Sequence, residues 1–260
     1  MILLGYILAI IVGILLGVFG GGGTILTVPI LVYIMGVDAV SATAYSLFIV
    51  GITALIGTLR YYQNKLIDFK IGILFAIPSF LGVFISRIYF LPKIPETLTL
   101  LDYFVVGKDK LILLLFALIM LLSAFSMIFS WRPKQTNSNT KLSIILLDGL
   151  VVGILTGIIG AGGGFIIVPA LLLLSNIDVK QAIGTSLFII TVKSLLGFSG
   201  DLTKPLDWEL MLLFSLLSVT GVFIGIYLSK HIKSSYLKKS FGVFILLMSI
   251  IILIKEIIFL

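Results

Sequence analysis

The sequence predicts an all-α protein that crosses a membrane many times. Of its 260 residues, 60% are hydrophobic and only 11% are charged, and the mean hydropathy is +1.29. Soluble domains average roughly 45–50% apolar and 25% charged residues, so this chain lacks the polar side chains to cover a water-facing surface. Apolar runs of about twenty residues, long enough for a hydrocarbon layer about 30 Å thick, alternate with short charged islands. This pattern excludes a soluble enzyme, an extracellular disulfide module and a disordered chain.

An internal duplication divides the chain into two halves. Shifting the sequence by 140 residues aligns 13–57 with 153–197 without a gap, and 18 of these 45 positions are identical. Shared apolarity alone would not keep polar and special-backbone residues in register, among them Gly20, Gly22, Gly23, Pro29, Asp38 and Ser46. The sequence therefore predicts a first transmembrane repeat over 1–131, a cytoplasmic linker over 132–141 and a second transmembrane repeat over 142–260.

Each half is expected to contain five helical segments. They are 2–19, 24–35, 41–59, 70–91 and 111–131 in the first half, and 143–159, 164–175, 181–199, 208–229 and 240–259 in the second. The second segment of each half follows a glycine cluster, contains a proline and is too short to cross comfortably as a straight helix. Discontinuous or re-entrant membrane helices have this pattern. We expect about eight full spans plus two short glycine-broken helices.

Loop charges favour inverted repeats. Residues 60–70 carry a net charge of +2, whereas their counterpart 200–209 carries −2. Residues 91–110 are balanced, whereas their counterpart 229–240 carries +4. Because Lys and Arg concentrate in cytoplasmic loops, homologous loops of opposite charge indicate halves of opposite orientation. This assignment puts 60–70, 132–141 and 229–240 inside and both termini outside.

The two glycine clusters are candidate binding elements. No Lys-Ser/Thr pair follows them, which excludes a phosphate-binding P-loop, and the βαβ context of a dinucleotide site is missing. Consecutive glycines interrupt a helix, and the N-terminus of the next helix offers unpaired N–H donors and partial positive charge to an anion. We expect the two helix ends to converge near the membrane midplane. The candidate binding residues of the clusters are Gly21, Gly22, Gly23 and Thr24 in the first half and Gly162, Gly163 and Gly164 in the second.

Hydroxyl and ammonium groups complete the expected substrate site. Ser46, Thr185 and Ser186 open the third segment of each half, although membrane-helix hydroxyls often only bond the backbone or a neighbouring helix. Lys193 lies deep in segment 181–199, where an unpaired charge costs about 3 kcal/mol or more, so it is a functional candidate. The alternatives for Lys193 are snorkelling and an ion pair with Asp148. Arg87, near a segment end, is expected to snorkel to the interface.

Other kinds of site lack the residues they need. The chain has no cysteine, no catalytic Ser-His pair and no HExxH sequence, so we expect neither an enzyme nor a cofactor or metal site. Its net charge is +7, but the positive residues lie between apolar segments and not on one face, so we expect no nucleic-acid partner. The expected partners are a small anionic substrate and the lipid bilayer. Whether the chain forms a homo-oligomer stays open.

The glycine motifs resemble those of a known family. GILLGVFGGGGTILTVPIL and GILTGIIGAGGGFIIVPAL, each followed by a helix with Ala-x-x-x-Ser-Leu, are similar to the TauE/SafE sulfite exporter family of membrane permeases. The resemblance covers roughly 5–256, and the first cluster reads GGGGT where the second reads GAGGG. It implies a multi-pass plasma-membrane protein with about eight spans that moves sulfite, organosulfonates or related sulfur-containing anions.

The sequence leaves two classes of function open. The first is a secondary transporter that binds an anion between its repeats and works by alternating access. The alternative is an anion channel, or a membrane scaffold subunit that moves no solute. The substrate, the direction of transport and the coupling ion are not readable from the sequence.

Overall fold

The computed structural model describes residues 2–100, 104–129, 142–160, 162–174, 177–203 and 205–258. The predicted linker, 132–141, lies outside the described residues. Ten helices of eleven residues or more make up most of the described chain: α1 Ile2–Phe19, α2 Gly22–Tyr33, α3 Ala39–Gln63, α4 Phe69–Ile85, α6 Lys108–Ile128, α7 Leu142–Ile159, α8 Gly164–Leu174, α9 Val179–Phe198, α10 Trp208–His231 and α11 Ser234–Ile258. Short elements extend two of them: the π-helix η1 Ser86–Phe90 and α5 Leu91–Lys93 follow α4, and the 3₁₀-helix η2 Ser199–Asp201 follows α9.

The ten helices match the ten predicted segments, but the number of full spans is smaller than expected. Seven stretches of the described chain are long and apolar enough to cross a membrane, where the sequence predicted about eight. The remaining predicted span, 143–159, is α7, whose described apolar part Ile144–Ile159 is too short to count. α2 and α8, with 12 and 11 residues, are the short helices that the glycine clusters predicted. At about 1.5 Å per residue, each covers roughly half of a bilayer core.

Aspartates determine where several helices begin. Asp38 accepts a hydrogen bond from the backbone N–H of Ser41 at the start of α3, at 2.9 Å. Asp68 and Asp207 accept equivalent bonds, each 3.0 Å long, at the starts of α4 and α10. A carboxylate at this position satisfies an otherwise unpaired backbone donor. The helix starts are therefore encoded locally.

A small hairpin interrupts the all-helical pattern. Strands β1 Thr97–Leu100 and β2 Phe104–Gly107 pair antiparallel, with Thr97 opposite Gly107. The sequence prediction of an all-α chain missed it, because it lies in a loop that carries no repeat signal. Threonine and valine, which favour strands, are frequent in these eight residues.

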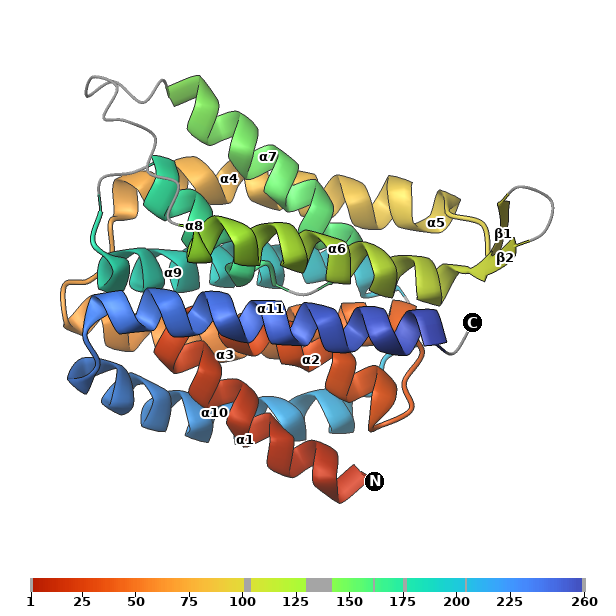
Figure 1. Cartoon of the computed structure of the whole chain (residues 1–260), viewed down its shortest axis with the longest axis horizontal. Helices are drawn as coiled ribbons and strands as arrows, with labels where there is room; N and C mark the ends of the chain where they lie inside the picture. The colour runs from red at the N-terminus through yellow and green to blue at the C-terminus, as the bar shows by residue number, and fades with distance from the viewer. Residues whose placement is uncertain are drawn as a thin grey trace.

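The long helices pack in pairs across the two halves. Figure 1 shows them lying side by side, with α1 starting and α11 ending at the same end of the bundle. The most extensive contacts join α1 to α10, α4 to α7, α6 to α11 and α3 to α9. Each pair takes one helix from each predicted repeat. The halves therefore interlock and do not form separate bodies.

Glycines allow the closest pairs to form. A Cβ atom on Gly13 of α1 would overlap the backbone carbonyl of Ser218 in α10. Gly153, at the matching position of α7, would overlap the backbone of Ser79 in α4 in the same way. Both glycines belong to a Gly-x-x-x-Gly spacing, which is typical of close contacts between membrane helices.

The central pair, α3 and α9, runs antiparallel. A Cβ on Gly51 would contact Leu195, and one on Gly57 would contact Leu187. Later residues of α3 therefore lie beside earlier residues of α9. Thr58 and Thr191 belong to the same contact between α3 and α9, with hydroxyl oxygens 3.2 Å apart. Two segments that occupy equivalent places in the repeat thus point in opposite directions at the centre of the molecule.

Candidate functional site

The two glycine clusters meet at the centre of the structure. Gly21, which precedes α2, lies against Gly164, the first residue of α8, so closely that a Cβ on either would overlap the backbone of the other. α2 and α8 therefore begin side by side. Since a helix N-terminus carries unpaired N–H groups and partial positive charge, two of them together favour a bound anion.

Glycine is required here by backbone conformation as well as by space. Gly20 and Gly160, at matching places in the two clusters, have φ angles of 68° and 71°. Gly162 and Gly163 also lie in the left-handed region, at 59° and 71°. For L-amino acids with a Cβ this region is sterically unfavourable, whereas glycine adopts it readily. The conformations explain why the clusters break the helix before α2 and α8.

Lys193 points into the second cluster. Its side chain is 0% exposed, and its Nζ donates a hydrogen bond to Thr156 Oγ1 at 2.7 Å. A Cβ on Gly163 would lie only 2.7 Å from the same Nζ, so the ammonium group sits against the segment that leads into α8. An ammonium has three N–H donors, and Thr156 accepts one of them. Sequence reasoning did not find Thr156, whose counterpart in the first repeat is Leu16.

The two alternatives for Lys193 do not match this geometry. With no exposed surface, Lys193 does not snorkel to the interface. Among the described residues, neither Lys193 nor Asp148 has an ion-pair partner. Asp148 Oδ2 is buried without a hydrogen-bond partner among the described residues. Within the described ranges, no carboxylate pairs with the ammonium group of Lys193.

The predicted hydroxyls have different surroundings. Thr24 Oγ1 donates to the carbonyl of Gly21 at 2.6 Å, and Ser186 Oγ donates to Ile183 and, at 3.2 Å, to Gly20. Ser46 Oγ is buried and has no hydrogen-bond partner in the described part of the chain, although it matches Ser186 in the repeat. Ser194 Oγ, which follows Lys193 in the sequence of α9, is also buried without a partner among the residues described, and the sequence analysis did not select it.

The remaining predicted residues are divided between the central group and other contacts. Gly162 lies against Val50 and Thr24, so it joins the central group. Gly22 and Gly23 instead pack against α1, near Phe19 and Val12. Thr185 accepts a hydrogen bond from the backbone N–H of Asp68, at 2.9 Å, where α4 begins.

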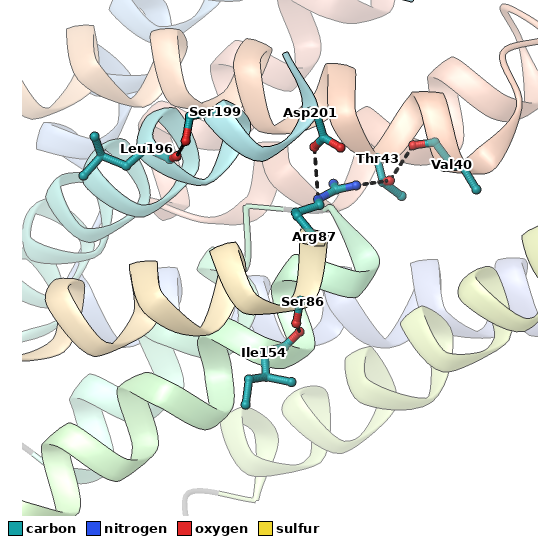
Figure 2. Close-up of polar contacts among 8 residues, drawn as sticks. All are labelled: Val40, Thr43, Ser86, Arg87, Ile154, Leu196, Ser199 and Asp201. Carbon is teal, nitrogen blue, oxygen red and sulfur yellow. Dashed lines mark hydrogen bonds and ion pairs between the residues drawn. The ribbon is translucent and has the colours of Figure 1, made fainter. Parts of the chain in front are cut away.

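A further charged group, Arg87, lies beside this centre, and the expectation that it snorkels is wrong. Arg87 is 1% exposed, and its Nε lies 3.3 Å from Asp201 Oδ2. Its Nη1 donates to Thr43 Oγ1 at 3.0 Å, and Figure 2 shows the guanidinium between Asp201 and Thr43. The pair joins η1 of the first half to η2 of the second. Sequence reasoning missed it because the partners lie 114 positions apart in the chain, each near a segment end.

The comparisons with known proteins agree with a transport role. The family model described as sulfite exporter TauE/SafE matches residues 5–255. A probable membrane transporter protein of Haemophilus influenzae is 29% identical in an alignment that covers 96% of this chain and 97% of that protein. Another, of Methanocaldococcus jannaschii, is 32% identical over 203 residues, 76% of this chain and 71% of that protein. A probable membrane transporter protein of Bacillus subtilis is 25% identical, covering 85% and 86%. No solved structure matches the chain.

Proposed function

Because this chain belongs to the sulfite exporter TauE/SafE family of membrane transporters, we propose that its cargo is a small sulfur-containing anion, such as sulfite or an organosulfonate. The family consists of transporters, so the chain is a multi-pass membrane transporter and not an enzyme. The plasma membrane is the proposed location.

The position of Lys193 is the observation that carries this proposal. Its ammonium group is fully buried, has Thr156 as its hydrogen-bond partner and lies against Gly163. Burial of an unbalanced charge within a membrane is unfavourable, and a bound anion would offset that cost. The adjoining N-termini of α2 and α8 add partial positive charge at the same place. A cation site would need carboxylates here instead.

An unpartnered hydroxyl supports the same assignment. Ser46 Oγ is buried and has no hydrogen-bond partner within the described residues. Ser46 lies in α3 between Thr43 and Val50, which contact Gly160 and Gly162 of the second cluster. Buried polar groups without partners are uncommon in proteins, because each loses its hydrogen bonds to water. An oxyanion has several acceptor oxygens, so it would satisfy donors of this kind. In this proposal Gly21, Thr24, Gly162, Gly163 and Gly164 supply the backbone of the site, with Ser46 and Lys193 as side-chain ligands. Gly22, Gly23, Thr185 and Ser186 hold it in place.

We further propose that the two halves form an inverted repeat and that transport occurs by alternating access. The antiparallel course of α3 and α9, which are equivalent segments, supports this arrangement. The helix pairs support it as well, because α1 packs on α10 and their counterparts in the other half, α7 and α4, pack on each other in the same way. The site is closed in the described conformation, with Lys193, Thr24 and Ser46 each 0% exposed. Rocking of one half against the other would open it to each side in turn.

Counterflow in proteoliposomes tests the proposal directly. The purified chain is reconstituted, the vesicles are loaded with unlabelled sulfite, sulfate, thiosulfate or methanesulfonate, and uptake of trace radiolabelled sulfite is followed. A carrier accumulates label transiently above equilibrium when a transported anion is inside. Empty liposomes, and vesicles loaded with chloride alone, are the controls.

The outcomes separate the candidate functions. Transient accumulation with a subset of these anions would support a carrier and rank its substrates. Rapid equilibration without accumulation would point to a channel. No flux of any of these anions would contradict the proposed substrate class.

A further inference from the structure

We propose that Arg87 is a second anion-binding residue of this transporter and that the transported anion replaces Asp201 as the partner of its guanidinium group. This inference rests on the anion transport proposed above. It adds a site on the path between the central glycine clusters and one end of the bundle, at a residue that the sequence assigned to the lipid interface.

One edge of the Arg87 guanidinium group has donors without hydrogen-bond partners among the described residues. Nη1 donates to Thr43 Oγ1 at 3.0 Å, but neither Nε nor Nη2 has a hydrogen-bond partner among the described residues. The 3.3 Å between Nε and Asp201 Oδ2 makes an ion pair without hydrogen-bond geometry. Nε and Nη2 form one edge of the planar group, and their N–H bonds point the same way. This edge accepts two oxygens of one oxyanion side by side.

The surroundings of Arg87 connect it to the proposed substrate site. Thr43, its hydrogen-bond partner, lies so close to Gly160 that a Cβ on that glycine would overlap it. Gly160 begins the second glycine cluster, and Gly163, three residues on, lies against Lys193 Nζ. The cluster therefore has a buried cationic side chain near each end. An anion that leaves Lys193 along this segment reaches Arg87 next.

The local backbone also departs from a regular helix at this place. Arg87 lies in the five-residue π-helix η1, between α4 and α5. π-Helical turns within α-helices occur frequently at functional sites, where they redirect side chains. Ser86, beside Arg87, donates to the carbonyl of Ile154 in α7 at 2.8 Å, which anchors the turn (Figure 2). The turn thus holds the guanidinium in the interior, where its charge would otherwise favour the interface.

A merely structural ion pair is the competing explanation, and it predicts different results. Buried ion pairs often add little net stability, because desolvation of both charges opposes their attraction. If Asp201 occupies Arg87 only until an anion arrives, the carboxylate competes with that anion. Removal of the carboxylate charge should then strengthen anion binding, whereas removal of the guanidinium should weaken it. A structural pair would instead be damaged by both changes.

The test compares three variants in sulfite counterflow at a series of sulfite concentrations. Arg87→Lys keeps the charge but loses the two-donor edge, so the half-saturating concentration should rise about tenfold or more. Asp201→Asn keeps the shape but loses the charge, so the half-saturating concentration should fall. Arg60→Lys, the same change at an exposed arginine of α3, should match the wild type. Elution as a single species in detergent and the midpoint of thermal unfolding establish that each variant is folded.

Several outcomes would overturn the inference. An unchanged half-saturating concentration in Arg87→Lys, or an increase in Asp201→Asn, would assign the pair to structure alone. Failure of both variants to fold would have the same meaning. If the wild-type protein transports none of the tested anions, the proposed function itself fails. If it transports sulfite and only the Arg87 prediction fails, the function stands without this second site.

Discussion

At the scale of single residues, two buried cations distinguish this chain from an ordinary helical bundle. Lys193 and Arg87 are both about 0–1% exposed, although each charge would be more stable in water. Arg87 has the carboxylate of Asp201 beside it, whereas Lys193 has the neutral hydroxyl of Thr156. The electrostatic imbalance at Lys193 is therefore the stronger indication of an anionic ligand.

Lys193→Met should abolish or strongly weaken sulfite exchange without unfolding the protein. Methionine fills a similar volume, and apolar replacement of a buried charge is often neutral or stabilising. Loss of a charged donor to the anion should raise the half-saturating concentration about tenfold or more. Counterflow and thermal unfolding of the purified variant measure the two effects.

Lys180→Met is the matched control, because Lys180 lies in the first turn of the same helix and donates to the carbonyl of Lys230, an exposed bond. It should exchange sulfite as the wild type does. Unchanged exchange in Lys193→Met would remove Lys193 from the substrate site.

At the scale of elements, the short helices α2 and α8 depend on glycine for their position. Their starts touch through Gly21 and Gly164, which leaves no room for a side chain on either backbone. Proline lies inside each of these helices, at Pro29 and Pro169. The close approach, more than helix propensity, keeps the two positive helix ends together.

Gly164→Ala should destabilise the protein by about 1–3 kcal/mol, the usual cost of overpacking. The added Cβ would overlap Cα of Gly21 and lie 3.0 Å from the carbonyl oxygen of Gly20, and a backbone does not give way as a side chain does. The midpoint of thermal unfolding in detergent measures the effect.

Gly107→Ala serves as its control, since a Cβ there would find no atom closer than Glu96 O at 4.0 Å. Alanine is favoured over glycine within isolated helices by about 1 kcal/mol. A rise in stability for Gly164→Ala would therefore contradict the described packing.

At the scale of the whole molecule, every major helix pair joins the two halves. α1 packs on α10, α4 on α7, α6 on α11 and α3 on α9. Such interlocking means that neither half buries its apolar surface alone. A movement between the halves must therefore slide packed helices past each other. The glycines of α1, α7 and α10 favour such sliding, because they leave few side chains to interlock at these contacts.

Cysteine labelling should place homologous loops on opposite sides of the membrane. These 260 residues contain no cysteine, so Lys65→Cys and Thr203→Cys each introduce a single reactive thiol at an exposed position. A membrane-impermeant maleimide applied to right-side-out vesicles should modify Thr203→Cys, and Lys65→Cys only after the membrane is opened. Modification of both from the same side would refute the inverted repeat.

Much of the fold is readable from the sequence because its causes are local. Helix positions follow from runs of apolar residues, several helix starts from aspartates such as Asp38 and Asp68, and the two broken helices from glycine clusters. The repeat predicts a short helix at the same place in each half, and α2 and α8 are these two helices. The pairing of β1 with β2 was missed, since the polar and apolar alternation of Thr97–Leu100 covers only four residues, and Phe104–Gly107 does not alternate.

The candidate site is only partly readable in this way. Sequence reasoning selected Lys193 because an intramembrane charge is conspicuous wherever it lies, and Ser46 because it recurs in both repeats. It did not find Thr156, whose side chain is ordinary in membrane helices until its neighbours are known. It placed Arg87 at the interface, because distance from a segment end does not reveal a partner in the other half.

The sequence by itself therefore determined the membrane class, the ten helical segments and the glycine breaks, all of which depend on residues near one another in the chain. It also contains the duplication, which a comparison of the chain with itself reveals without any contact between the halves. Only the tertiary structure decided that Gly21 meets Gly164, that Lys193 faces Thr156 and not Asp148, and that Arg87 pairs with Asp201. These contacts join residues 37 to 143 positions apart. Their formation depends on how helices of both halves pack, because an apolar helix has no local preference for the neighbour it will contact.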